Sequence, residues 1–182
     1  MRHIKIVNSI LLIISLFLIT SCSNNSTMKP EDFKNKEPRL IIEEYLTGNV
    51  KAWGVLQNRS GKVTRQFSAD LDGSWDGKQL ILKEKFNWDD GEIQNREWTI
   101  TKIDENNYEG TAGDVVGKAI GYSYGPAFKF EYVLLVPVKG KEMKITFDDW
   151  IFKQDERVAI NRATMTKFGF KVAELTVVFV KD

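Results

Sequence analysis

The segment KQLILKEKFNWDDGEIQNREWTI, residues 78–100, has the alternating pattern of β-strands. Apolar or aromatic side chains recur at alternate positions in its first half, at Leu80, Leu82, Phe86 and Trp88. The dipeptide Asp90-Gly91 then interrupts the pattern, and a second alternating run extends from 92 to 103. Alternation places one set of side chains on each face of a strand, and Asp-Gly is a strong turn signal. The segment therefore predicts a β-hairpin.

The same arrangement continues on both sides of this hairpin. Turn signals recur at Ser60-Gly61, Asp72-Gly73, Asp76-Gly77, Asp90-Gly91, Asn106-Asn107, Lys139-Gly140 and Phe168-Gly169. Strands of about ten residues joined by short turns favour an antiparallel up-and-down barrel, because closure removes exposed strand edges. We predict an all-β, lipocalin-like barrel of about eight to ten strands. Residues 40–46 are either a short helix ended by Gly48 or a first strand.

One stretch, from Gly110 to Gly125, breaks this rhythm with five glycines. Glycine within a strand marks a bulge, a sharp bend or the close approach of another group. The stretch predicts a barrel corner near the mouth, with a plain irregular loop as the alternative.

The N-terminus has the layout of a bacterial lipoprotein precursor. A basic start precedes the apolar run from Ile10 to Ile19, which is shorter than the roughly 20 residues needed to span a bilayer core. Ile19-Thr20-Ser21-Cys22 resembles the lipobox read by lipoprotein signal peptidase. We therefore expect removal of residues 1–21, lipidation of Cys22, a flexible tether over 22–38 and a barrel domain over 39–182. An ordinary signal peptide with an incidental cysteine is the alternative.

Lipidation predicts where the protein resides. Stable anchoring needs two acyl chains or more, and a mature bacterial lipoprotein carries two or three on this cysteine. The acyl chains on Cys22 are thus expected to make the membrane a partner, placing the domain in the cell envelope. Ser23 lacks the acidic side chain that retains enterobacterial lipoproteins at the inner membrane. In a Gram-negative source this predicts the outer membrane, facing the periplasm.

Composition excludes several function classes. Loss of Arg2 and Lys5 with the signal leaves 24 of the 26 basic residues against 25 acidic ones, a balance that argues against nucleic-acid binding and against a polybasic membrane-surface role. The only histidine, His3, leaves with them, and the only cysteine is Cys22. This removes Ser-His-Asp and Cys-His catalysis and His- or Cys-ligated zinc. We expect no cofactor and no metal, and an enzyme is not the favoured reading.

Charged side chains on apolar strand faces are the candidate ligand-binding residues. They and the tryptophans beside them are Arg65, Glu84, Arg96, Trp98, Asp148, Trp150 and Arg162. Asp148 and Asp149 point to opposite faces, so at least one must face inward. Because an isolated buried charge is very costly, we expect Arg96, Arg162, Glu84 and Asp148 to meet inside the barrel.

Three arginines against one or two carboxylates would leave an excess of positive charge in the interior. Such an interior could receive a carboxylate or phosphate head group between apolar walls. A salt-bridge network that closes a filled barrel is the alternative.

Several motifs carry a resemblance to a known family. They are Trp53-Gly54, Gly73-Ser74-Trp75-Asp76-Gly77, Arg96-Glu97-Trp98, Gly113-Asp114-Val115-Val116-Gly117, Phe147-Asp148-Asp149-Trp150, Asn161-Arg162-Ala163 and Lys167-Phe168-Gly169. From about Leu40 to the C-terminus the chain resembles an uncharacterised family of bacterial lipoproteins, a domain of unknown function. The resemblance implies a lipocalin-like barrel, an envelope location and an association with fatty-acid modification. It implies no activity, since fold alone supplies none.

Three functions remain open from the sequence. The first is a lipid-anchored barrel that binds a small amphipathic ligand, with a fatty-acyl lipid as the candidate. The second is a structural or partner-binding lipoprotein with a filled barrel. The third is an acyl-modifying enzyme that uses Glu84 or Asp148 as a general base.

The lipobox generates a direct test. Replacing Cys22 by alanine removes the thiol that carries the diacylglyceryl group, so Cys22→Ala should incorporate no labelled palmitate and lose acyl-chain membrane affinity. Metabolic labelling and membrane fractionation measure both effects. Palmitate on the variant equal to that on the wild type would contradict the assignment.

Overall fold

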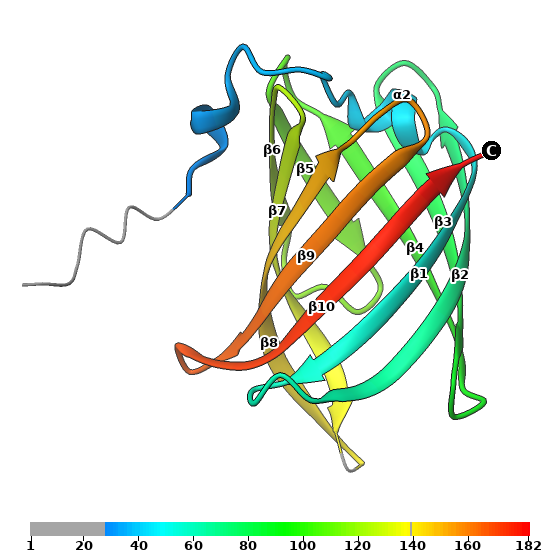
Figure 1. The fold of residues 1–182 in the computed structure, drawn as a ribbon, viewed down its shortest axis with the longest axis vertical. Helices are drawn as coiled ribbons and strands as arrows, with labels where there is room; N and C mark the ends of the chain where they lie inside the picture. Colours follow the sequence, from blue (N-terminus) through cyan, green and yellow to red (C-terminus); the bar gives the residue numbers. More distant parts are fainter. Residues whose placement is uncertain (1–27, 139) are drawn as a thin grey trace, which may run out of the picture.

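The barrel is the dominant feature of the computed structural model, which describes residues 28–138 and 140–182. Within those residues ten antiparallel strands form a closed ring in which each strand pairs with its neighbours in sequence and β1 pairs with β10 (Figure 1). The strands are β1 (Gly48–Asn58), β2 (Val63–Trp75), β3 (Gln79–Trp88), β4 (Ile93–Lys102), β5 (Asn107–Ala112), β6 (Ala119–Tyr124), β7 (Ala127–Val138), β8 (Lys141–Lys153), β9 (Val158–Lys167) and β10 (Phe170–Lys181). The predicted all-β, lipocalin-like barrel is confirmed. The predicted signal peptide and Cys22 lie outside the described residues.

The β-hairpin predicted from residues 78–100 is present in the structure. β3 and β4 pair in register, with Glu84 opposite Arg96 and Leu82 opposite Trp98. Gly91 has a φ of +87° in the connecting turn, where the Trp88 N–H donates to the Glu92 carbonyl at 3.0 Å. Glycine adopts this left-handed backbone conformation without steric cost because it has no Cβ. Hydrophobic alternation and turn chemistry together therefore fix this register.

The glycine-rich stretch shortens two strands. β5 and β6 have six residues each, and the loop 113–118 between them returns along β7. The Val116 N–H donates to the Val133 carbonyl at 2.8 Å, and the Leu135 N–H donates to the Asp114 carbonyl at 2.9 Å. The loop thus takes over strand-like hydrogen bonding beside β7, where β6 has ended.

A short helix closes one end of the barrel. α2 (Ile42–Leu46) lies across that end (Figure 1), and Leu40, Ile42, Tyr45 and Leu46 are buried there. We call residues 40–46 the plug. Glycine at position 73 on β2 allows the plug to pack closely on this strand, because a Cβ there would overlap the Leu46 carbonyl oxygen. Of the two alternatives left by the sequence, the helix is therefore the one observed.

Polar contacts hold the plug in place. The buried carboxylate of Glu43 accepts hydrogen bonds from the Lys102 ammonium and from the Tyr108 hydroxyl, the latter at 2.9 Å. The Ser123 hydroxyl donates to the Leu40 carbonyl at 2.8 Å, and the Lys181 ammonium donates to the Thr47 carbonyl at 2.8 Å. Buried polar groups are tolerated when they find such partners. The plugged end is therefore sealed by satisfied polar groups as well as by apolar packing.

The N-terminal segment packs on the outside of the barrel. The 3₁₀ helix η1 (Pro30–Phe33) buries Pro30, and the Phe33 ring lies 6.0 Å from the Trp150 ring and 5.5 Å from the Phe152 ring. A flexible tether was expected over 22–38. Within its described residues, 28–38, Phe33 packs on Trp150 and Phe152. In the described part of the chain, no helix is both long enough and apolar enough to cross a membrane.

The contact at Gly73 predicts a stability effect. Gly73→Ala pushes a methyl group into the Leu46 carbonyl, and overpacking of this kind costs about 1–3 kcal/mol of unfolding free energy. Gly113→Ala is the matched control, because none of the described atoms lies within 4 Å of its would-be Cβ. Urea denaturation of both variants measures the difference. Equal stabilities would show that the plug does not depend on Gly73.

Candidate functional site: a two-part cavity in the barrel

Two adjoining hollows occupy the barrel interior. The inner chamber, of about 100 Å³, lies beneath the plug and includes Ile42 and Leu46 in its lining. The outer chamber, of about 320 Å³, lies toward the opposite, unplugged end and includes Trp88 and Pro137. Phe67, Phe86, Arg96, Tyr132 and Leu175 line both chambers. The barrel is therefore hollow, and its cavity runs from the open end toward the plug.

Aromatic side chains form much of the cavity wall. Alternate positions of β7 place Phe128, Phe130 and Tyr132 inward, where the Trp98 ring lies 5.2 Å from Phe130 and 5.3 Å from Tyr132. On the other side of the barrel the Phe67 ring lies 4.9 Å from Trp88. Large rigid rings offer apolar contact area to a ligand at little cost in side-chain entropy.

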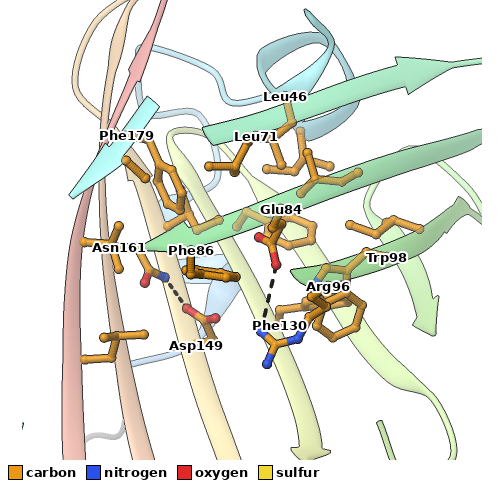
Figure 2. Close-up of a pocket in the computed structure, with 18 of the residues that line it drawn as sticks. Leu46, Leu71, Glu84, Phe86, Arg96, Trp98, Phe130, Asp149, Asn161 and Phe179 are labelled. Atoms are coloured by element: carbon orange, nitrogen blue, oxygen red, sulfur yellow. Dashed lines mark hydrogen bonds and ion pairs between the residues drawn. The ribbon is translucent and has the colours of Figure 1, made fainter. Parts of the chain in front are cut away.

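One arginine organises the charges in the interior. The Arg96 guanidinium donates two hydrogen bonds from Nε and Nη2 to Asp114, the shorter at 2.8 Å. Its Nη1 lies 3.8 Å from Oε2 of Glu84, the partner residue on the adjacent strand, and Figure 2 marks this ion pair. Among the described residues, Glu84 Oε2 has no hydrogen-bond partner. That oxygen is therefore a buried acceptor without a hydrogen bond, next to the Arg96 guanidinium.

A second carboxyl group lies nearby. Asp149 accepts hydrogen bonds from the Tyr132 hydroxyl at 2.8 Å and from the side-chain amide of Asn161 (Figure 2). Asn161 also donates to the Trp150 carbonyl at 3.0 Å, which fixes the orientation of its amide. We call the set Glu84, Arg96, Asp114, Tyr132, Asp149 and Asn161 the interior polar cluster.

Burial changes the protonation of this cluster. Desolvation raises the pKa of Glu84 to about 7, helped by the negative charge of Asp149 and opposed by Arg96. Desolvation also raises the pKa of Asp149, although its hydrogen bonds from Tyr132 and Asn161 act in the opposite direction. A proton on Glu84 near neutral pH reduces the unbalanced negative charge.

The sign of the interior charge corrects the prediction from sequence. An excess of arginine was expected, yet three carboxyl groups meet one guanidinium in the described interior polar cluster. Arg65 lies at the outer chamber and is bound to Asp90 and Glu92, at 2.8 Å each. Within residues 28–138 and 140–182, no group of three His, Cys, Asp or Glu side chains is arranged to hold a metal ion.

Four of the seven predicted site residues line the cavity. They are Arg65, Glu84, Arg96 and Trp98. The Arg65 guanidinium lies 4.0 Å from the centre of the Trp88 ring, which is the arrangement of a cation–π contact.

The other three predicted residues lie on the outer face, which is a correction. Asp148 lies 3.5 Å from Lys129, Trp150 is covered by Phe33, and Arg162 is 65% exposed with Glu174 at 3.2 Å. The reason is strand parity. Asp149 and Asn161 point inward, so Asp148, Trp150 and Arg162, each one residue away, point outward.

The candidate residues predicted from the sequence did not include Asp114, Tyr132, Asp149 or Asn161, although one of Asp148 and Asp149 was expected to face inward. Alternation of Phe128, Phe130 and Tyr132 was a usable signal for the tyrosine, because all three share one strand face. Asp114 lies in a loop, where alternation carries no information.

Comparison with known proteins places the chain in a family. The family described as "Protein of unknown function (DUF3833)" matches residues 16–181. The chain belongs to this family. The match confirms the resemblance to an uncharacterised family noted in the sequence. No curated protein matches the chain.

Two solved structures have a similar fold. An S-type phycobiliprotein lyase from Guillardia theta is 10% identical with a TM-score of 0.58, over 77% of this chain and 90% of the lyase. A DUF3598-family protein of unknown function from Nostoc punctiforme is 16% identical with a TM-score of 0.60, over 81% of this chain and 51% of that protein. At such low identity the likeness extends to the fold alone.

The pairing of Arg96 predicts a large effect on stability. Arg96→Gln leaves Glu84 and Asp114 without their cation in the interior, and breaking a buried ion pair costs roughly 3–5 kcal/mol. Arg162→Gln removes a mostly exposed arginine and should cost less than about 1 kcal/mol. Thermal and urea melts of the two variants make the comparison. A cost for Arg96→Gln as small as that for Arg162→Gln would contradict the interior placement.

The raised pKa of Glu84 predicts a pH dependence. The folded state binds this proton more tightly than the unfolded state, whose ordinary pKa is 4.5. The contribution of Glu84 to the stability of the wild type therefore falls as pH rises from about 4.5 to about 7, whereas Glu84→Gln cannot ionise. The free energy of unfolding of Glu84→Gln relative to wild type should rise by roughly 3 kcal/mol over that interval, at 1.36 kcal/mol per pKa unit. Denaturation at pH 4.5, 6 and 8 tests this, with the exposed Glu97→Gln as the control. A flat difference would contradict it.

Proposed function

We propose that this protein is a lipid-anchored envelope lipoprotein whose barrel binds a small amphipathic ligand, with a fatty-acyl lipid as the candidate. The observation that carries the proposal is the cavity itself. It leads from the open end, between aromatic walls, to the interior polar cluster. Pockets that bind small molecules combine a mostly apolar lining with a few polar groups that fix orientation.

The hollow interior favours binding over the filled-barrel alternative. A structural salt-bridge network would satisfy its buried polar atoms, because unsatisfied ones are costly. Among the described residues, Glu84 Oε2 has no hydrogen-bond partner, and the Glu84 side chain borders the inner chamber.

The charge of the cluster sets the expected orientation of an acyl ligand. A carboxylate head group placed beside Glu84 and Asp149 would add negative charge where carboxyl groups are already in excess. We infer that the acyl chain enters tail first and packs on the aromatic walls. Its anionic end then stays near the open end, where Arg65 lies.

A specific observation also supports a second candidate, an acyl-modifying enzyme. A general base works best with a pKa near the working pH, and burial raises the pKa of Glu84 to about 7. Asp148, the other carboxylate considered from the sequence, lies on the outer face. Turnover that is lost in Glu84→Gln while ligand binding persists would favour the enzyme.

The anchor and its location remain part of the proposal. Acyl chains on Cys22 would hold the barrel at the envelope, at the outer membrane and facing the periplasm in a Gram-negative cell. The balanced charge of the expected mature chain is compatible with an acyl anchor. Two acyl chains on one protein hold it at a membrane without a polybasic patch.

Filling the cavity tests the binding function. Leu175 lines both chambers, so Leu175→Trp should weaken the binding of a fluorescent fatty acid by at least about tenfold, the effect of losing roughly 1.4 kcal/mol of contact. Val178→Trp, on the outer face of the same strand, is the matched control and should bind as the wild type does. Circular dichroism verifies that both variants keep the barrel. Equal titration curves for the two variants, or none for the wild type, would reject fatty-acyl binding in the cavity.

A further inference from the structure

The turn between β9 and β10 exposes two phenylalanines. Phe168 is 88% and Phe170 is 73% exposed, more than any other large apolar side chain in the described chain. Phe168 also has a φ of +52°, a conformation that is uncommon for a bulky residue. Large apolar side chains held out in solvent mark interaction sites when they gather with others.

Basic side chains surround these rings. Lys167 and Lys171 flank the turn, and the Lys167 ammonium lies 5.2 Å from the centre of the Phe168 ring. The strand order places the β1–β2 and β7–β8 hairpins on either side of β9–β10, and all three turns lie at the unplugged end (Figure 1). These neighbours add four exposed cations and two partly exposed valines, Arg59, Lys62, Lys141, Lys144, Val63 and Val138.

Few acidic groups offset these cations. In the described residues of the β1–β2, β7–β8 and β9–β10 turns and the adjoining strand ends, the acidic residues are Glu142 and Glu174. Glu142 is exposed, whereas Glu174 is bound to Lys171 at 2.7 Å and to Arg162 at 3.2 Å. The β3–β4 turn at the same end is acidic instead, with Asp89, Asp90 and Glu92. The open end therefore has a basic, apolar side and an acidic side. We call the basic side, formed by residues 58–63, 138–144 without 139, and 167–171, the basic rim.

We propose that the basic rim docks on the surface of an anionic lipid bilayer, with Phe168 and Phe170 entering the headgroup region. Aromatic rings flanked by lysines suit this interface, because the rings leave water while the ammonium groups stay beside lipid phosphates. The two rings protrude from a narrow turn, a shape that can enter a fluid interface without a preformed pocket. Docking in this orientation would turn the cavity mouth toward the bilayer, which is a source of acyl lipid. The inference rests on the proposed function only in taking the ligand to be such a lipid.

Burial of the exposed rings would supply part of the binding free energy. Moving one phenylalanine side chain out of water is worth about 1.5–3 kcal/mol, or roughly 10- to 100-fold in binding. Each lysine near an anionic surface contributes about fivefold. The surface therefore needs no further contact to bind vesicles measurably.

Vesicle binding tests the proposal without the acyl anchor. Residues 28–182 contain the closed ring of strands and the plug but not Cys22. This form should co-sediment with vesicles of phosphatidylglycerol and phosphatidylcholine, bind phosphatidylcholine alone more weakly, and release as salt is raised. Phe168→Ser combined with Phe170→Ser should weaken binding by more than tenfold, and Lys167→Gln or Lys171→Gln by about fivefold each.

A matched control separates membrane docking from nonspecific binding by exposed apolar side chains. Ile93 is 61% exposed at the same end but next to the acidic β3–β4 turn, so Ile93→Ser should bind vesicles as the wild type does. Equal losses in Ile93→Ser and in the phenylalanine variants, or no vesicle binding at all, would overturn the proposal. Dimerisation in sedimentation velocity that depends on Phe168 and replaces vesicle binding would also overturn it, because a second copy would then be the occupant.

The same variants distinguish this inference from the proposed function. The double phenylalanine variant should titrate a fluorescent fatty acid in solution as the wild type does, since neither ring lines a chamber. A wild type that binds vesicles but no fatty acid would reject the ligand while supporting the docking surface.

Discussion

The ten strands of the described ring set the width of the barrel and therefore the space inside it. Eight strands close a barrel that side chains fill or that holds one small ligand, and the width grows with each added strand. With ten strands in the described ring, inward side chains alone leave space. The plug fills that space at one end, aromatic rings from β4 and β7 reduce it in the middle, and the two chambers are what remains. The cavity is thus a consequence of strand count.

The interior polar cluster shows how charge is accommodated in such a space. A guanidinium inside a barrel requires anionic partners, and Asp114 meets Arg96 from a loop that exists because β5 and β6 stop early. The remaining carboxyl groups are held by hydrogen bonds or by a proton, as the raised pKa values of Glu84 and Asp149 indicate. The cluster is therefore not inert packing. It leaves Glu84 Oε2 without a hydrogen bond in the described interior, beside the inner chamber.

The sequence predicted the barrel well because its signal is local. Alternation and an Asp-Gly turn fix the β3–β4 register, so Glu84 and Arg96 were correctly brought together. Prediction failed where the outcome depends on distant contacts. Whether Asp148 or Asp149 faces inward depends on how β8 meets the rest of the sheet. Trp150 faces outward by the same strand parity, and its ring is covered by Phe33, more than a hundred residues earlier in the chain.

The pairing of the first strand with the last has a consequence for how the chain folds. β1 and β10 meet along nine residue pairs from Val50 to Asn58, and Lys181 also ties down the plug. A ring closed by its two ends cannot be completed until the final strand is available. Contacts of such large sequence separation slow folding, and until closure both end strands expose unpaired edges that can join other chains. A polypeptide made or exported from its N-terminus must therefore be kept from aggregating over its whole length.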